Sequence, residues 1–454
     1  MSHVSRSDEV RARIRDLVAE YYAVTWGDPT PFVPGTTRIP YGGRVFGAEE
    51  FDLLVDSALD FWLTSGRYAE RLERELGDYL GLRHCLLVNS GSSANLLAFM
   101  ALTAERLGER RIRRGDEVIT VAAGFPTTVA PIVQYGAIPV FVDVRTDTVN
   151  VDAALLEQAV GPLTKAVFLA HTLGVPFDVD AVRSVCERHD LWLIEDNCDA
   201  LGSLYKGRRT GGFGHIGTSS FYPPHHMTMG EGGAAYTNEP ELAVILASLR
   251  DWGRDCICRG GEDNRCGHRF DRQFGELPLG YDHKYVFAEF GYNLKVTDMQ
   301  AAVGCAQLAR VPDFTRLRRE NHATLSRLLE PVAELLRAQA ATACSEPSWF
   351  GLLLTLTGEA KAAGLTRDGI VARLEAAGIQ TRMLFAGNMV RQPCFEGIRA
   401  PGSDAQGCAY RVPDGLDVTD AIMNDAFWVG VYPGLTDDML AYVGEQVALA
   451  CEAR

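Results

Sequence analysis

The chain has 454 residues and a formal net charge of −15, from 44 Lys and Arg residues against 59 Asp and Glu residues. This acidic balance argues against a nucleic-acid partner, and no apolar run approaches the roughly 18 residues of a transmembrane helix. Eleven cysteines without a signal-peptide pattern predict cytoplasmic thiols or metal ligands rather than a disulfide framework. Only five lysines offer an amine for Schiff-base chemistry: Lys165, Lys206, Lys284, Lys295 and Lys361.

Residues 1–60 predict a helical arm, a Pro- and Gly-rich connector and a second helix that begins near Ala48. We interpret this segment as an appendage rather than a domain. Residues 61–325 form the predicted large domain, in which short apolar runs alternate with helical patterns between about residues 66 and 240. Such alternation indicates an α/β fold with a mostly parallel sheet that helices cover on both faces.

The periodic pattern breaks between residues 250 and 290, where about 34 residues are rich in Gly, Arg and Asp. A loop of this length inside a compact domain is usually functional or disordered. The sequence after it predicts a helix over VTDMQAAVGCAQLARV, followed by a long, arginine-rich helix. Residues 326–454 predict a smaller C-terminal α+β domain.

Two glycine-containing turns invite a phosphate or nucleotide interpretation. The segment NSGSSANLLAFMAL places Gly91 and Ser92 between a strand and a helix, where backbone N–H groups can bind an anion, although the same pattern also serves as a helix cap. Gly212, Gly214 and Gly217 spell G-x-G-x-x-G, but an apparent strand follows where a dinucleotide fold requires a helix. We therefore assign these glycines to a turn.

Polar residues also follow two predicted strands. The run LWLIEDNCDALG ends a buried strand in Glu195 and Asp196, at the edge where open α/β sheets bind ligands. An aspartate there can keep a pyridinium nitrogen protonated, or it can simply cap a helix. The run SSFYPPHHMTMGEGG carries His225 and His226 on a loop, where a histidine pair more often fills the surface or the core.

Taken together, these motifs resemble one family. The order of SGSSANLLA, AGFPTT, IEDNCDALGS, SFYPPHHMTMGEGG and GYNLKVTDMQAA, between about residues 60 and 310, is similar to the fold-type I sugar aminotransferases. That family uses pyridoxal phosphate (PLP) to modify nucleotide-linked keto sugars. The resemblance implies a fold-type I PLP-dependent transferase, with a large cofactor-binding domain and a smaller C-terminal α+β domain.

His225 is the main departure from the family pattern. In the family, a lysine six residues before the Glu of the G-E-G-G return, here Glu231, holds the cofactor as a Schiff base. An imidazole cannot form that bond. The histidine resembles the subgroup of NDP-4-keto-6-deoxyhexose 3-dehydrases, which use pyridoxamine phosphate (PMP) and remove the C3 hydroxyl with the histidine as base.

Four cysteines have a distinctive spacing. Cys198, Cys256, Cys258 and Cys266 are separated by 57, one and seven residues. This spacing resembles the [2Fe–2S] signature of the 3-dehydrase that acts on CDP-4-keto-6-deoxyglucose with a separate reductase. Four thiolates also suit structural zinc, although C-x-C is tighter than the usual zinc spacing. We expect the other seven cysteines to be packing residues: Cys85, Cys186, Cys305, Cys344, Cys394, Cys408 and Cys451.

The resemblance also assigns residues to cofactor binding. It implies that Asp196 pairs with the ring nitrogen and that Phe125 stacks on the ring. It further implies that the phosphate is bound by Gly91, Ser92 and Ser220.

Other roles follow from the same resemblance. Asn293 is implied to reach the phosphate of the neighbouring subunit, which predicts a homodimer. His225 is implied to be the base, and Asp199 to lie on the other side of the ring and to link the cluster to the cofactor. Tyr222 and Phe350 are weaker candidates for the same environment.

The resulting hypothesis is C3 deoxygenation of an NDP-4-keto-6-deoxyhexose by a cytoplasmic enzyme. The enzyme would use PMP, with electrons arriving from a flavin or ferredoxin-type reductase through the [2Fe–2S] cluster. Three alternatives remain: a dehydrase that uses glutamate and has no cluster, a non-catalytic sugar sensor on the aminotransferase fold, and a zinc-stapled sugar-binding protein. The sequence does not distinguish CDP from dTDP in the substrate.

Overall fold

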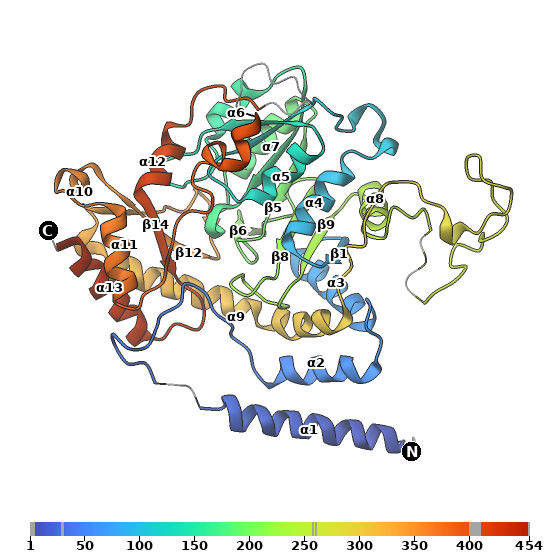
Figure 1. The fold of residues 1–454 in the computed structure, drawn as a ribbon, viewed down its shortest axis with the longest axis horizontal. Helices are drawn as coiled ribbons and strands as arrows, with labels where there is room; N and C mark the ends of the chain where they lie inside the picture. Colours follow the sequence, from blue (N-terminus) through green and yellow to red (C-terminus); the bar gives the residue numbers. More distant parts are fainter. Residues whose placement is uncertain (1–4, 29–30, 257, 259–260, 399–409, 453–454) are drawn as a thin grey trace.

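The computed structural model describes residues 5–28, 31–256, 258, 261–398 and 410–452 (Figure 1). A seven-stranded sheet lies at the centre of the molecule. Listed in spatial order, its strands are β1 (His84–Val88), β9 (Gly233–Thr237), β8 (Ile216–Ser220), β5 (Trp192–Asp196), β4 (Thr164–Ala170), β2 (Glu117–Val121) and β3 (Ile138–Val142). Only β9 pairs antiparallel with its neighbours, β1 and β8. This mostly parallel sheet confirms the predicted fold class.

Helices bury both faces of the sheet. On β4, Ala166 and Phe168 belong to the core formed with α4 and α8, whereas Val167 and Leu169 belong to the core formed with α6 and α7. Consecutive residues of a strand point to opposite faces, so a strand covered on both sides is apolar throughout. The helices of this part are α3 (Arg67–Leu80), α4 (Gly91–Ala101), α5 (Pro126–Gln134), α6 (Ala153–Ala159), α7 (Val179–Arg188) and α8 (Pro240–Arg250).

The C-terminal part forms a second, antiparallel sheet. Its strands, in spatial order, are β10 (Leu336–Ala338), β12 (Gly351–Leu356), β14 (Ala426–Gly430) and β13 (Thr381–Arg382). Its helices are α10 (Gly358–Ala362), α11 (Arg367–Ala376), α12 (Asp417–Asp425) and α13 (Asp437–Glu452). A small third sheet joins β11 (Ser345–Glu346), β6 (Leu204–Tyr205) and β7 (Arg208–Arg209). The domain boundary expected near residue 325 remains a prediction.

One long helix, α9 (Asp298–Leu328), replaces the two helices that the sequence predicts in this region. Pro312 lies inside it, and a proline normally ends or kinks a helix because it lacks an N–H and crowds the preceding turn. Here α2 and α3 pack against α9, and α13 packs against it as well. Tertiary packing on α9 therefore outweighs the local cost of the proline.

The N-terminal arm consists of α1 (Arg6–Trp26) and α2 (Ala48–Asp60), as expected. No residue of α1 is buried, and it lies along α2 at the edge of the molecule (Figure 1). Charged contacts hold it there: Arg11 Nε lies 2.6 Å from Asp56 Oδ1, and Arg15 pairs with Asp52. Aromatic contacts of Tyr22 with Phe46 and Phe51 add to these ion pairs in attaching α1.

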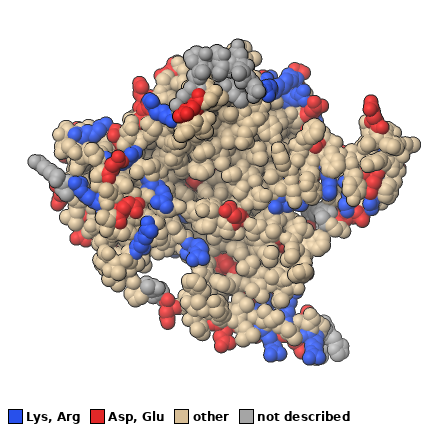
Figure 2. Space-filling view, viewed as in Figure 1, with Lys and Arg blue, Asp and Glu red and all other residues tan. Residues whose placement is uncertain are grey.

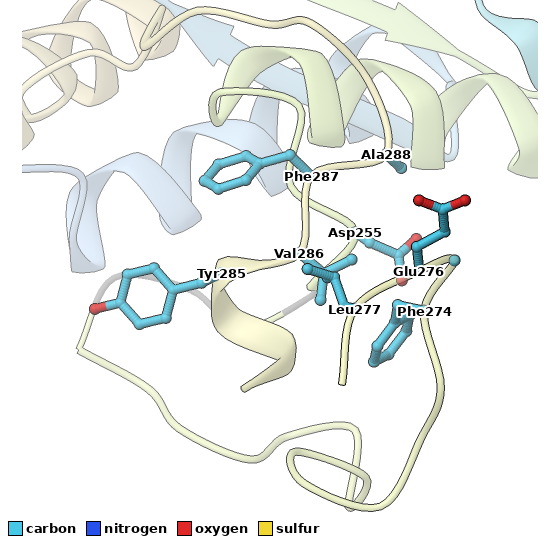
Figure 3. Close-up of a pocket in the computed structure, with 9 residues that line it drawn as sticks. Asp255, Phe274, Glu276, Leu277, Tyr285, Val286, Phe287 and Ala288 are labelled. Atoms are coloured by element: carbon cyan, nitrogen blue, oxygen red, sulfur yellow. The ribbon is translucent and has the colours of Figure 1, made fainter. Parts of the chain in front are cut away.

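The segment between α8 and α9 extends away from the body (Figure 1). Apart from a short 3₁₀ turn at His283–Tyr285, its described residues form no helix and no named strand. A cavity of about 570 Å³ opens within it, lined by Asp255, Phe274 and Tyr285 among others (Figure 3). Several large apolar side chains of this loop are exposed, and Phe290 is fully so.

The surface carries both signs of charge. On the face seen in Figure 2, acidic and basic side chains are interspersed rather than gathered into one broad patch. Within the described ranges, none of the helices combines the length and the apolar character that crossing a membrane requires.

Candidate active site

Asp196 is the last residue of β5 and points its carboxylate into a buried polar network. Asn95 Nδ2 and Thr128 Oγ1 each donate a hydrogen bond to Asp196 Oδ2 at 2.7 Å. The N–H of Cys198 donates to Asp196 Oδ1 at 3.2 Å. Asp196 therefore does not cap a helix, and two side chains from α4 and α5 fix its orientation at the carboxyl edge of the sheet.

His225 lies close to Asp196 and Asp199, on the loop between β8 and β9. His225 Nδ1 is buried without a hydrogen-bond partner, and it lies 3.6 Å from Asp199 Oδ1. Burial lowers the pKa of His225 to about 4, against the opposing effect of the Asp196 carboxylate. The imidazole is therefore neutral at pH 7 and free to accept a proton.

Asp199 has an unusual protonation state. Burial, followed by the nearby Asp196 carboxylate, raises the pKa of Asp199 to about 8. This carboxyl group is thus mostly protonated at neutral pH, beside a neutral histidine. Two neighbouring groups with pKa values pushed in opposite directions are typical of sites that move protons.

Gly91 and Ser220 meet between the N-terminus of α4 and the end of β8. A Cβ atom added at Gly91 would lie 2.3 Å from Ser220 Cβ, so only glycine fits there. Ser90 caps α4 by accepting a hydrogen bond from the N–H of Ser93. The helix-cap interpretation is thus correct for Ser90, while the first turn of α4 still offers N–H groups and partial positive charge for a phosphate.

The remaining predicted contacts lie around this centre or outside it. Phe125 precedes α5 and is 51% exposed, and Tyr222 is 49% exposed. The Phe350 ring lies 5.3 Å from the His225 ring. Asn293 is exposed near the C-terminal end of the protruding loop. Its backbone forms an isolated β-bridge with Asp251, at the start of the loop.

Together these residues fit a phosphorylated pyridine cofactor. A buried aspartate stands ready for a ring nitrogen, a partly exposed aromatic ring can cover the ring face, and a glycine cradle at a helix N-terminus suits a phosphate. The unpartnered Nδ1 of His225 leaves a polar atom available in the same buried region. The roles of the individual residues remain predictions.

Three of the four proposed metal ligands lie together on the protruding loop. The Cys256 thiol interacts with Cys258 and Cys266. Each sulfur accepts a backbone N–H: Cys256 Sγ from Cys258 at 3.4 Å, Cys258 Sγ from Arg265 at 3.3 Å, and Cys266 Sγ from His268 at 3.4 Å. Burial raises the pKa of the Cys256 thiol, and the backbone N–H of Cys258 opposes this effect.

Cys198 lies apart from these three cysteines. It follows β5 in the body of the molecule, where its thiol lies against Asp196 and Thr218, and burial raises its pKa well above the usual value. Among the residues that the structure describes, no three His, Cys, Asp or Glu side chains converge as a metal site. The four-cysteine ligand set therefore remains a prediction.

The other cysteines follow the packing expectation only in part. Cys186, Cys305 and Cys451 are buried, but Cys344 and Cys394 are exposed. Cys408 lies outside the described residues.

The G-x-G-x-x-G segment is a turn that leads into β8, as predicted from the missing helix. Its backbone wraps the carboxylate of Glu195, which accepts N–H groups from Gly211 at 2.9 Å and Gly214 at 2.5 Å. A Cβ at Gly217 would collide with Gly211 O at 2.1 Å. These glycines therefore serve close packing around a buried acid.

The sequence did not single out three residues that shape the site: Asn95, Thr128 and Arg318. Asn95 lies four residues after Gly91, on the same face of α4, which is the one local signal for it. Thr128 belongs to the quoted AGFPTT motif but had no assigned role. Arg318 is a buried arginine of α9, and nothing in its local sequence separates it from its exposed neighbours.

Comparison with known proteins places this geometry in context. The DegT/DnrJ/EryC1/StrS aminotransferase family profile matches residues 46–448. The chain is 52% identical over 437 residues to the lipopolysaccharide biosynthesis protein RfbH of Salmonella typhimurium, covering 96% of this chain and 97% of that one. It is 48% identical over 441 residues to the dTDP-4-dehydro-2,6-dideoxy-D-glucose 3-dehydratase of Saccharopolyspora spinosa, covering 97% and 91%.

A solved structure shares the fold over most of both chains. A variant of GDP-4-keto-6-deoxymannose-3-dehydratase (ColD) with bound GDP-perosamine matches with a TM-score of 0.78 and 26% identity, covering 90% of this chain and 99% of that one. The E. coli GDP-4-keto-6-deoxy-D-mannose-3-dehydratase with bound hydrated PLP matches with a TM-score of 0.77 and 27% identity, covering 90% and 98%.

Proposed function

Because the chain belongs to the DegT/DnrJ/EryC1/StrS aminotransferase family, we propose that it is a PMP-dependent enzyme that removes the C3 hydroxyl of a nucleotide-linked 4-keto-6-deoxyhexose. The observation that carries this proposal is His225, which occupies the position of the family's cofactor-binding lysine. Since imidazole cannot bond covalently to the cofactor, transamination loses its usual means of regeneration. The relatives named as nucleotide-sugar 3-dehydratases support the same reaction.

The residues of the chain divide the work as follows. The cofactor, when bound, supplies an amine for the C4 ketone of the sugar and a ring that withdraws electrons. Asp196 holds the ring nitrogen, Phe125 covers the ring, and the turn at Gly91 and Ser92 binds the phosphate together with Ser220. His225 would take up the proton that leaves the amine-bearing C4′ carbon of the cofactor as the C3 hydroxyl departs, because its imidazole is neutral at pH 7.

Asp199 stands beside this base. Because its pKa is raised, the Asp199 carboxyl group stays protonated near neutral pH. Asp199 and His225 are then both neutral, and Asp199 adds no second negative charge beside Asp196. Tyr222 flanks the loop, where its backbone carbonyl accepts the N–H of His225 at 3.0 Å.

Deoxygenation also needs a source of electrons. We propose a [2Fe–2S] cluster at Cys198, Cys256, Cys258 and Cys266, reduced by a flavin or ferredoxin-type reductase. The spacing of these cysteines and the N–H donors to the three loop sulfurs support it. The position of Cys198 counts against a complete ligand set in one described chain, so we derive no step through the cluster.

We also propose a cytoplasmic homodimer in which the protruding loop contacts the second subunit. Asn293 and the apolar residues near it, Phe290 and Tyr292, are exposed at the end of this loop. Clustered exposed apolar side chains commonly mark a protein–protein interface.

A second candidate is the dehydrase that completes its cycle with glutamate and has no cluster. One relative, solved at 27% identity with a TM-score of 0.77, carries a trapped PLP-glutamate geminal diamine. A non-catalytic sensor fits less well, because the neutral His225 and the protonated Asp199 form a proton-transfer pair that binding alone does not require.

The decisive experiment supplies the purified protein with PMP and 4-keto-6-deoxy sugars linked to CDP or dTDP. We expect mass spectrometry to show a product that lacks one oxygen, formed either with a reductase system or with glutamate, which separates the two candidates. His225→Asn should lower kcat by roughly 10²–10⁴-fold, because it removes a general base. His225→Lys should bind PLP covalently, visible as an absorbance change, and lose deoxygenation.

A surface substitution provides the control. His189→Asn changes a histidine that is paired with Glu157 on the surface and should leave kcat unchanged. Unimpaired deoxygenation by His225→Asn would contradict the base assignment, and the absence of any deoxygenated product from wild-type protein would contradict the proposed function.

A further inference from the structure

Arg318 is a buried cation directly behind the loop that carries His225. The side chain is 1% exposed and comes from the middle of α9. Its Nη2 donates hydrogen bonds to the carbonyl oxygens of Pro224 at 3.4 Å and His225 at 3.2 Å. The guanidinium therefore holds the main chain at the position of the candidate base.

The Arg318 side chain also binds the main chain just before β12, the strand that begins at Gly351. Its Nη1 donates to the carbonyl oxygens of Trp349 at 3.2 Å and Phe350 at 3.4 Å, just before β12. The Phe350 ring lies 5.8 Å from the guanidinium and 5.3 Å from the His225 ring. One arginine thus fastens the His225 loop, α9 and the start of β12 to one another.

Burying the charged Arg318 side chain costs free energy that a residue serving only to fill space would not require. No carboxylate of the described residues lies within ion-pair distance of Arg318, and its Nε is buried without a partner. An apolar side chain would fill the same space without the desolvation of a charge. Burial lowers the pKa of Arg318 to about 10, so the group still carries its charge at neutral pH.

We propose that Arg318 is a positioning residue for the base: its guanidinium fastens the main chain of the His225 loop to the start of β12 by donating to four carbonyl oxygens, those of Pro224, His225, Trp349 and Phe350. This inference rests on the proposed role of His225 as base. Arg318 acts through the main chain of His225.

The test compares two substitutions at one position. Arg318→Met removes the charge and the donors, and should lower kcat by about 100-fold with KM changed less than about threefold, because a small displacement of a catalytic group costs about this much. Arg318→Lys keeps the charge but should also lose kcat, because one ammonium cannot span four carbonyls.

The adjacent arginine is the matched control. Arg319 donates to the carbonyls of Glu346 and Pro347 near the surface, so Arg319→Met should leave both kcat and KM unchanged. Circular dichroism and thermal unfolding check that each variant folds. If Arg318→Met does not fold, Arg318→Lys decides the positioning role.

A readout without turnover separates this proposal from the proposed function. Amide hydrogen exchange in residues 222–227 should be faster in Arg318→Met and in Arg318→Lys than in wild type and in Arg319→Met, because the carbonyls of Pro224 and His225 lose their donor. Wild-type kcat in folded Arg318→Lys, or unchanged exchange of this segment in folded Arg318→Met, would overturn the inference. Failure of wild-type protein to deoxygenate any tested sugar would refute the proposed function and leave the exchange result standing.

Discussion

Glu195 is a buried acid of the central sheet that is surrounded by hydrogen-bond donors. Besides Gly211 and Gly214, the N–H of Phe213 donates to it at 2.6 Å, and His171 Nε2 lies 3.0 Å from its carboxylate. Burial alone would raise the pKa of Glu195, but His171 and the backbone N–H groups outweigh it, and the pKa lies below the usual value. The ionised form is therefore favoured in the folded protein.

Replacing this acid tests the importance of the network. Because the folded-state pKa lies below the unfolded value of about 4.5, the stabilisation is fully present above pH 4.5 and is lost as the pH falls through the folded pKa. Glu195→Gln should lower the free energy of unfolding by about 3–5 kcal/mol at neutral pH, and by less in acid. Urea unfolding at several pH values measures this.

The control for this substitution is an exposed acid. Glu187 pairs with Arg183 on the surface of α7, so Glu187→Gln should change the free energy of unfolding by less than about 1 kcal/mol. A Glu195→Gln protein as stable as wild type at neutral pH would mean that the buried carboxylate contributes nothing to the fold.

At the scale of residues, sequence motifs located Asp196 and His225 but not their partners. The motifs are local, and resemblance to a family supplied their meaning. Asn95 and Thr128 contact Asp196 across 101 and 68 residues of chain, and Arg318 reaches His225 across 93. Contacts of this length depend on how the helices pack on the sheet, which no local pattern contains.

In the loop between α8 and α9, His283 contacts one of the proposed metal ligands, Cys266. His283 is buried, and its Nε2 lies 2.8 Å from Asp255 Oδ2, while its Nδ1 lies 3.4 Å from Cys266 Sγ. The His283 ring stacks on Phe274, which also lines the cavity of the loop (Figure 3). Asp255 and His283 thus fix the position of one proposed metal ligand.

Metal binding at this loop can be measured directly. After anaerobic reconstitution with iron and sulfide, we expect wild-type protein to show visible charge-transfer absorption and bound iron. Cys256→Ser should lose most of the iron, because a [2Fe–2S] centre needs four thiolates. His283→Phe should retain less iron than wild type, because Cys266 loses its support.

Two further variants complete this measurement. Cys394→Ser alters an exposed cysteine elsewhere and should bind iron as wild type does. Cys198→Ser shows whether the fourth ligand is the cysteine near Asp196. Wild-type protein that stays colourless and free of iron would exclude the cluster and leave the glutamate-dependent candidate.

At the scale of elements, the sequence predicted the strands well and the long helix poorly. Apolar runs such as those of β4 and β5 carry a strong signal, because both faces of the sheet are buried. In α9, Pro312 breaks the local pattern, and packing against other elements, α2 and α3 foremost, keeps the helix continuous. The arrangement of the cysteine loop depends on side-chain contacts that composition does not encode.

Across the whole molecule, α9 connects the parts that build the site. Gln300 near its start donates to the carbonyl of Glu231 at 2.8 Å, and Gln307 donates to Glu50 on α2 at 2.7 Å. Further along, Asn321 donates to the carbonyl of Tyr432, after β14, at 3.0 Å. The register of one helix therefore sets contacts with the N-terminal arm, the His225 loop and the second sheet together.

A single inserted residue tests this dependence. One alanine inserted after Leu308 would turn the rest of α9 by about 100° and shift it by about 1.5 Å relative to its first half. We expect a loss of more than about 4 kcal/mol in the free energy of unfolding and loss of activity, because Arg318 and Asn321 would leave their partners. Urea unfolding and the deoxygenation assay measure both.

An insertion outside α9 serves as the comparison. One alanine after Gly364, in the exposed turn between α10 and α11, should cost less than about 1 kcal/mol, since surface turns tolerate insertions. Equal effects of the two insertions would show that the register of α9 has no special importance.

The hydrogen bonds from Arg318 to carbonyl oxygens also have a consequence for how such enzymes diverge. Main-chain atoms are the same for every amino acid, so the loop is held at position 225 whichever side chain projects from it. A substitution between lysine and histidine there can change the reaction type without a new way of anchoring the loop. Evolution can therefore exchange one chemistry for another at this position while the rest of the scaffold stays as it is.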